Sequence, residues 1–195
     1  MGLKNDVWIR HQAVYEKMIE PFHASKMRVG QHTESPAISY GLTSYGYDMT
    51  LGDDFKVFVP RIGAIIDPKH FPVEALDDVE VVNTTEGSYV EMPPHSFALC
   101  RSGEYFKIPK NVLCVCLGKS TYARCGLILN ITPLEPGWRG YVTIEVTNST
   151  PLPARIWIGE GIAQVLFFEG DDEPEQGYGT GKYQDQQEGI QIPLV

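Results

Sequence analysis

The residue that most suggests chemistry is Glu145, which lies in the middle of a β-branched run, residues 141–147. In an extended chain the aliphatic residues of this run share one face, and Glu145 lies on the other with Thr143. Glutamate has a low propensity for strands, so its presence here needs a reason. Either the carboxylate is solvated on an exposed face, or it is partly buried and moves a proton, with a pKa set by burial or by a cation such as Arg124.

A second candidate is the polar turn Gly-Lys-Ser-Thr at residues 118–121. It resembles the end of a phosphate-binding P-loop, but the glycine that this motif needs five positions earlier is absent. The P-loop hypothesis therefore fails. What remains is a turn in which Lys119, Ser120 and Thr121, with Arg124 close behind, could offer two cations and two hydroxyls to an anion. A solvated basic turn between strands would explain the same composition.

The third candidate is a tail, residues 169–195, whose stretch 169–188 is acidic, rich in glycine and glutamine and poor in aliphatic residues. Such a composition predicts a mobile segment. It carries Tyr178, Lys182 and Gln186, which would ordinarily be solvated. In a glycine-rich tail these side chains could instead fold over a bound anion as a lid.

Several familiar catalytic motifs are missing. His-Thr-Glu at residues 32–34 matches part of the zinc-dependent nucleobase deaminase signature, but the Pro-Cys-x-x-Cys that completes it is absent. The sequence also contains no His-Glu-x-x-His, Gly-x-Ser-x-Gly or Gly-x-Gly-x-x-Gly. The four cysteines form no Cys-x-x-Cys pair, so we expect buried free thiols and no zinc.

The elements that must position these residues are mostly short strands. Residues 5–19 carry apolar side chains at helical spacing, with Asn5 or Asp6 as an N-cap and Pro21 beyond, which predicts one amphipathic helix. After it, many Gly and Pro residues separate short β-branched or aromatic runs, which predict strands at 55–59, 64–66, 79–82, 96–101, 112–117, 127–131, 141–147, 155–158 and 163–168. Because no second clear helix alternates with them, a sandwich or barrel-like β fold is favoured over parallel β-α-β units.

Length and charge limit the classes of partner. The chain has 195 residues and a formal net charge of −9, which fits a single domain, residues 1–195. An acidic surface disfavours nucleic acid and anionic membranes, but it does not exclude a small phosphorylated ligand. No run approaches the roughly 18 apolar residues of a membrane span, and the first residues lack the apolar core of a signal peptide, so we expect a cytoplasmic protein.

Six segments in a fixed order carry a resemblance to a known family: 44–48, 118–127, 132–140, 143–145 with Asn148, 159–164 and 181–186. Together they are similar to the core motifs of dCTP deaminases, within the wider group that also contains the trimeric dUTPases. The similarity extends over nearly the whole chain from about residue 36 onward. The ordered set is much more specific than any one of its members.

The resemblance implies a mainly β fold, a distorted β-barrel or jelly roll of the dUTPase-like (β-clip) type with a short N-terminal helix. It implies a homotrimer with active sites between subunits. The implied reaction is the zinc-independent hydrolytic deamination of dCTP to dUTP and ammonia, which supplies dUTP and dUMP for thymidylate synthesis. Mg²⁺ would arrive on the triphosphate, as expected of a hard cation with few protein ligands, and dTTP would be a candidate feedback inhibitor.

The resemblance also assigns roles by position. Glu145 matches the catalytic glutamate, which takes a proton from the water that attacks C4 of cytosine. Ser120 and Arg124 match residues that position this water and stabilise charge near the reacting carbon. The implied substrate-binding residues are Lys119, Ser120, Thr121, Tyr122, Ala123, Arg124, Thr143, Ile144, Glu145, Gln164, Tyr178, Lys182 and Gln186.

Two alternative functions stay open. In dUTPases the turn equivalent to residues 134–138 carries an aspartate that activates water for attack on the phosphate chain. Here Glu135 stands at that position, and Trp138 replaces the tyrosine that packs under deoxyribose. The first alternative is therefore a bifunctional dCTP deaminase and dUTPase that forms dUMP and pyrophosphate. The second is a non-catalytic nucleotide-binding relative.

Overall fold

A computed structural model describes residues 2–195; Met1, where the predicted domain begins, lies outside the described residues. The elements in chain order are β1 (Gly2–Leu3), α1 (Asp6–Tyr15), β2 (Ile19–Glu20), β3 (Met27–Val29), β4 (Pro36–Thr43), β5 (Gly46–Phe58), the 3-10 turn η1 (Val73–Ala75), β6 (Leu76–Asp78), β7 (Val82–Thr84), β8 (Gly87–Met92), β9 (Phe97–Lys107), β10 (Val112–Gly118), α2 (Ser120–Arg124), β11 (Leu127–Asn130), β12 (Arg139–Asn148), β13 (Ala154–Trp157), β14 (Gly161–Glu169) and the 3-10 turn η2 (Tyr178–Thr180).

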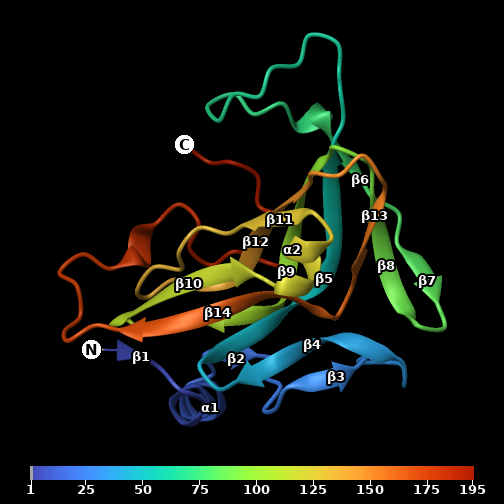
Figure 1. Ribbon diagram of the computed structural model, residues 1–195. Coiled ribbons are helices and arrows are strands. Elements are labelled where there is room, and N and C mark those ends of the chain that lie inside the picture. Colours follow the sequence, from blue (N-terminus) through green and yellow to red (C-terminus); the bar gives the residue numbers. More distant parts are fainter. Residues whose placement is uncertain (1) are drawn as a thin grey trace.

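Most strands belong to one large antiparallel sheet. Its main path is β1-β14-β5-β9-β12-β11, and β10 pairs with β14, β4 with β5, and β2 with β9. The sheet curls into a half-barrel, with β10 and β14 crossing in front of β9 and β12, while the small sheet β13-β8-β7 lies at one side (Figure 1). The predicted mainly β fold with a short N-terminal helix is confirmed.

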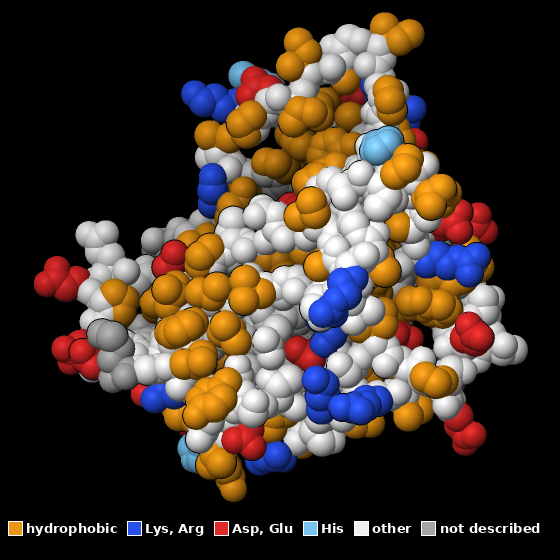
Figure 2. Space-filling model, in the orientation of Figure 1, with side chains coloured by type: hydrophobic (Ala, Val, Ile, Leu, Met, Phe, Trp, Pro, Cys, Tyr) orange, Lys and Arg blue, Asp and Glu red, His pale blue; other side chains and the backbone are white. Residues whose placement is uncertain are grey.

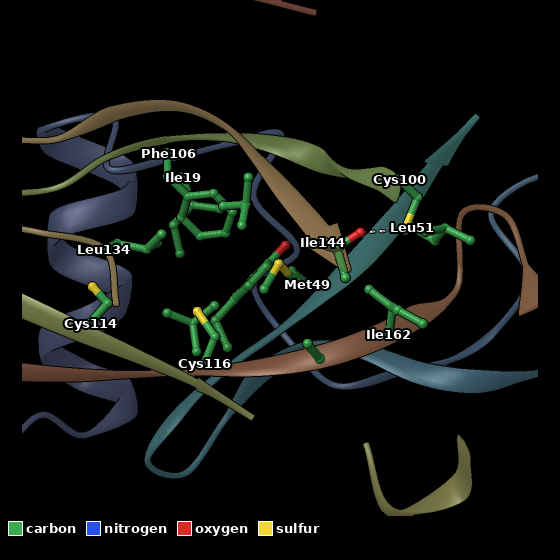
Figure 3. Close-up of a cluster of buried hydrophobic side chains, with 14 of the residues drawn as sticks. Ile19, Met49, Leu51, Cys100, Phe106, Cys114, Cys116, Leu134, Ile144 and Ile162 are labelled. Atoms are coloured by element: carbon green, nitrogen blue, oxygen red, sulfur yellow. Dashed lines mark hydrogen bonds between the residues drawn. The ribbon is translucent and has the colours of Figure 1, made fainter. Parts of the chain in front are cut away.

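The hydrophobic core fills the inside of the curl. In β10 the side chains alternate, so that Cys114 and Cys116 point inward while their neighbours face out. They meet Met49 from β5 and Ile144 from β12 in one buried cluster (Figure 3). Each fully buried aliphatic side chain of this kind contributes about 1.5–3 kcal/mol. This packing fixes β12 in its place between β9 and β11.

The predicted thiol burial is right for three cysteines and wrong for the fourth. Cys100, Cys114 and Cys116 are buried and free. Cys125 is free but exposed, because it follows directly after α2 on the surface.

The predicted helix 5–19 is too long. Asn5 does cap it, its Oδ1 accepting from the backbone N–H of residue 8 at 3.2 Å, but α1 ends at Tyr15. Lys17 has a φ of 58°, a left-handed conformation that a helix cannot continue through. Ile19 then pairs with β9 as part of β2. The side chains that α1 buries are Ile9 and Ala13.

Two predicted strands are wrong. Residues 64–66 lie in a loop, residues 59–72, in which the side chains of Ile62 and Ile65 are exposed and no neighbouring strand supplies a ladder. The run 79–82 is split, because the chain leaves β6, which pairs with β5, and only then enters β7 of the small sheet. β-branched composition alone does not show whether a partner strand is near.

Candidate active site

Glu145 lies in the second half of β12, where its backbone is fixed on both sides. Its Cα faces Asn130 of β11 and Leu99 of β9. The adjacent Ile144 is fully buried in the core, so Glu145 is directed to the opposite face of the sheet. The alternation predicted for residues 141–147 is therefore confirmed, and it sends the carboxylate away from the core.

On that face Glu145 lines a cavity of about 410 Å³. The walls come from the 59–72 loop, the turn 131–138 and the tail, and they are mainly apolar and aromatic, including Phe71 and Trp138. The polar groups in the lining include Thr132, Glu135, Thr143, Glu145, Gln186 and Gln191. A mainly apolar cavity with a few polar groups is typical of a small-molecule site.

One oxygen of the Glu145 carboxylate lacks a hydrogen-bond partner among the described residues. This oxygen, Oε2, is buried and makes no hydrogen bond to any residue in the described range 2–195. A buried acceptor left in this way costs free energy, which an entering molecule can recover by donating to it. Burial raises the pKa of Glu145 above its usual value. A carboxylate with a raised pKa is a better proton acceptor near neutral pH, which favours the general-base role over simple solvation.

The tail reaches this cavity through Gln186. Its Nε2 donates to Thr143 Oγ1 at 3.0 Å, and its backbone carbonyl accepts from Tyr141 N–H at 3.1 Å. Gly140 forms a parallel bridge with Gln186, and a Cβ at Gly140 would stand 2.8 Å from the Gln186 backbone nitrogen. Glycine is thus required for this close approach. The tail lies directly on the exposed side of β12.

The other two tail residues behave differently. Tyr178 lines the same cavity as Glu145. Lys182 does not line it, and its Nζ donates to the carbonyl of Leu194 at 2.6 Å. We call Thr143, Glu145, Tyr178 and Gln186 the Glu145 group.

A second set of predicted residues lies on α2, a five-residue helix that was predicted only as a turn. Arg124 Nη1 donates to Ser120 Oγ at 3.1 Å, one helical turn away. Ser120, Thr121, Ala123 and Arg124 are exposed. We call Ser120, Thr121 and Arg124 the α2 group; it presents two hydroxyls and a guanidinium to solvent.

Buried contacts hold α2 in place. The Tyr122 side chain is buried, and its hydroxyl accepts from Trp157 N–H at 2.9 Å. Lys119 precedes the helix, and its Nζ contacts Asp48 Oδ2 at 2.5 Å and Ser39 Oγ at 3.3 Å. Tyr122 and Lys119 therefore have structural partners within the chain.

Two other predicted site residues do not line the cavity. Gln164 of β14 donates from Nε2 to Oγ1 of Thr43 in β4 at 3.1 Å. Ile144 directs its side chain into the core, and its carbonyl accepts from Cys100 Sγ at 3.4 Å, the dashed line in Figure 3.

Seven of the predicted residues thus form two separate groups, the Glu145 group and the α2 group, and the others belong to neither. Within residues 2–195, neither 119–124 nor Gln164 belongs to the lining of the Glu145 cavity. Sequence reasoning missed the aromatic and aliphatic lining from the 59–72 loop, such as Phe71. The run of isoleucines between Pro60 and Pro68 was a signal for it, since such residues in a loop need something to contact.

The described residues hold neither a cluster of metal-binding side chains nor a helix that could span a membrane. In residues 2–195, no three His, Cys, Asp or Glu side chains gather as a metal site. In the same residues, no helix has the length and apolar character needed to cross a membrane.

Comparison with known proteins gives consistent matches. The profile of the dCTP deaminase-like family matches residues 5–170. The dCTP deaminase of Chlamydia muridarum (strain MoPn / Nigg) is 55% identical over 201 residues, and that of Herpetosiphon aurantiacus is 53% identical over 197 residues, each alignment covering 100% of both chains.

Among solved structures, the 2′-deoxycytidine 5′-triphosphate deaminase from Agrobacterium tumefaciens has a similar fold. The TM-score is 0.56 at 15% identity, covering 87% of this chain. This chain spans about half of that one, since the match covers 48% of it.

Proposed function

Because the chain belongs to the dCTP deaminase-like family, we propose that it is an enzyme that hydrolyses dCTP to dUTP and ammonia, with Glu145 as its general base. The observation that carries this role is the buried, unpartnered Oε2 of Glu145 in the wall of the cavity. In the proposed reaction Glu145 takes a proton from a water as the water oxygen bonds to C4 of cytosine. The same carboxyl group then donates a proton to the departing amino group, which leaves as ammonia.

The cavity suits the base and sugar of the nucleotide. Its aromatic and aliphatic lining provides apolar surface, and Thr143 and Gln186 provide hydrogen-bonding groups near Glu145. Exclusion of water by this lining keeps the pKa of the carboxylate raised and strengthens its interactions. We expect Tyr178 to contribute to the same wall.

The triphosphate is assigned to the α2 group, with Lys119, Gln164 and Lys182 as further candidate contacts. An exposed guanidinium beside two hydroxyls is well suited to phosphate oxygens. Ser120 and Arg124 would also position the attacking water and stabilise charge at C4. Mg²⁺ enters this scheme as part of the substrate, bound to the phosphates.

The two groups would meet in one site if different copies of the chain supplied them. This is the support for a homotrimer with sites between subunits: in a single chain the α2 group does not line the Glu145 cavity. A nucleotide whose base contacts Glu145 in one copy and whose phosphates contact Arg124 in another would bind only in the assembly.

The surface next to α2 fits a second copy. β10 and β14 pair with Leu113 opposite Phe168 and Val115 opposite Leu166, and these side chains face away from the core. Hydrophobic side chains gather over these two strands on the surface in Figure 2. Leu117, at the end of this row, is exposed and lies two residues before Lys119. A strand with apolar side chains on both faces is normally covered by other protein on both faces. The core covers the inner face of β10 and β14, and a second copy of the chain would cover the outer face.

The cytoplasm is the proposed location, since buried free thiols are typical of a reducing compartment. We also propose that dTTP competes with dCTP, because it offers the same deoxyribose and triphosphate to the same groups.

The test is to incubate the protein with dCTP and Mg²⁺, follow ammonia, and separate dUTP from dUMP. Ammonia together with dUTP is the expected result. Pyrophosphate with dUMP would instead indicate the bifunctional enzyme, in which Glu135 would need a role. Nucleotide binding without turnover would refute the proposal and leave a non-catalytic relative. CTP in place of dCTP measures discrimination at the 2′ position, and the proposed competition is checked by adding dTTP.

A further inference from the structure

Arg101 is a buried charge that has no part in the proposed chemistry. Arg101 lies on β9, and its Cα pairs with that of Thr143 in β12, two residues from Glu145. Its side chain is only 7% exposed. A buried guanidinium is costly unless carboxylates or other acceptors surround it, so its partners show what it is for.

Its partners come from two different parts of the chain. Nη2 donates to Asp53 Oδ1 of β5 at 2.6 Å and to Glu188 Oε1 of the tail at 2.8 Å. Nη1 donates to the carbonyl of Ser102 at 3.1 Å, and the guanidinium lies over the ring of Tyr141, 5.2 Å from its centroid. Arg101 therefore links the sheet to the tail.

The link lies next to the contact that brings the tail to the cavity. Glu188 is two residues beyond Gln186, whose side chain donates to Thr143, the residue opposite Arg101. Two residues further on, the backbone N–H of Ile190 donates to Asp54 Oδ2 at 2.8 Å. The tail is thus tied to the sheet at three successive points, and residues 191–193 then line the cavity.

The two carboxylates that pair with Arg101 belong to different parts of the chain, Asp53 to β5 and Glu188 to the tail. Both are largely exposed, at 72% for Asp53 and 70% for Glu188. Loss of Glu188 would leave the guanidinium still paired with Asp53, so the barrel keeps its buried charge neutralised. The tail would lose one of these three contacts with the sheet, the ion pair with Arg101. Loss of Asp53 would leave the guanidinium paired with Glu188, so the tail would keep its contact with Arg101.

We propose that Arg101 and Glu188 are positioning residues for the reaction: their ion pair anchors the tail so that Gln186 stays on Thr143 and the cavity around Glu145 stays enclosed. This inference rests on the proposed function for its catalytic consequence. The anchoring itself is a property of the protein without substrate and can be measured separately.

The experiment compares Glu188→Gln with the matched control Asp53→Asn. Each removes one carboxylate from the same guanidinium, and only the first removes a contact between the guanidinium and the tail. Hydrogen exchange without nucleotide should show the Tyr141 and Ile190 amides, which bond across the tail contact, exchanging roughly tenfold faster in Glu188→Gln and unchanged in Asp53→Asn. Equal exchange in both variants, or no change in Glu188→Gln, would overturn the anchoring.

Kinetics then test the positioning role. Glu188→Gln should raise KM for dCTP about five- to twentyfold with kcat within about twofold, since binding must now order the tail, while Asp53→Asn leaves both unchanged. Glu188→Asp, which keeps the charge, should restore part of the KM. A fall in kcat with unchanged KM would contradict the role. If the wild-type protein does not turn over dCTP, the proposed function fails, and the exchange experiment still decides the anchoring.

Discussion

Replacing Glu145 by glutamine should lower activity and raise stability together. The variant cannot accept a proton, so kcat should fall by the roughly 10²–10⁴-fold that general-base catalysis supplies. It also removes an ionised group whose buried Oε2 has no partner in the described chain, a penalty of about 1–3 kcal/mol. Because the side chain is only partly buried, water screens the charge and the gain should be near 1 kcal/mol. For a chain of this size that raises Tm by about 2–4 °C.

The gain in stability should depend on pH in a defined direction. Burial raises the folded-state pKa of Glu145 above the ordinary value of 4.5. In the pH interval between these two pKa values, the folded protein binds more protons than the unfolded chain. The wild-type protein then loses stability as pH rises through the interval. The glutamine variant should therefore melt higher at pH 8 and at the same temperature as the wild type near pH 4.

The assay pairs ammonia release at saturating dCTP with thermal melts at the two pH values. Glu135→Gln is the matched control, because Glu135 is a second carboxylate in the lining of the same cavity. It should keep dUTP formation close to the wild-type rate. A Glu145→Gln variant that retains kcat within about tenfold of the wild type, or that melts lower at pH 8, would refute the reasoning.

Three further predictions follow from the same structure. Glu104 is fully buried, and burial raises its pKa from 4.5 to about 7, so its contribution to stability is complete below pH 4.5. The free energy of unfolding should fall by about 3 kcal/mol as pH rises to 7. Glu104→Gln should flatten this dependence on pH in urea titrations, and an unchanged dependence would count against the prediction. Inactive Glu145→Gln and Arg124→Ala chains, refolded together, should regain part of the activity if sites lie between copies, and no regain would argue for sites within one chain. Leu117→Glu places a charge on the apolar face of β10, so it should shift the protein to smaller species in sedimentation while circular dichroism stays native; an unchanged sedimentation coefficient would place the contact elsewhere.

The fold class was predictable because alternation in the strands is local. Buried residues alternate with more exposed ones along β12 and most of β10, and the face of Glu145 followed from that alternation alone. The end of α1 was not predictable from spacing, because Lys17 takes a left-handed conformation and Ile19 is recruited by β9. The wrong strand at 64–66 has a similar cause, since strand formation depends on a partner that composition does not reveal.

The sequence predicted individual candidate residues, Glu145 among them, but it did not predict which of them lie together. Glu145 and the tail residue Gln186 line one cavity because Gly140 lets the tail approach β12. The bridge between Gly140 and Gln186 spans 46 positions of sequence. Lys119 was expected to be a free cation, and it has a buried partner in Asp48, 71 positions away. Such pairings depend on which strands become neighbours, which no local pattern encodes. The Arg101 link to Glu188 was missed for the same reason.

The distribution of the thiols makes the protein a ready substrate for site-selective labelling. Burial raises the pKa of Cys100, Cys114 and Cys116, in the last case to about 12, so at neutral pH these remain unreactive thiols. Cys125 alone among the four is exposed, directly after Arg124. A maleimide fluorophore should therefore attach at one position without any engineered cysteine. The dye would stand beside the α2 group, where its emission could report the arrival of a triphosphate or of a second copy of the chain.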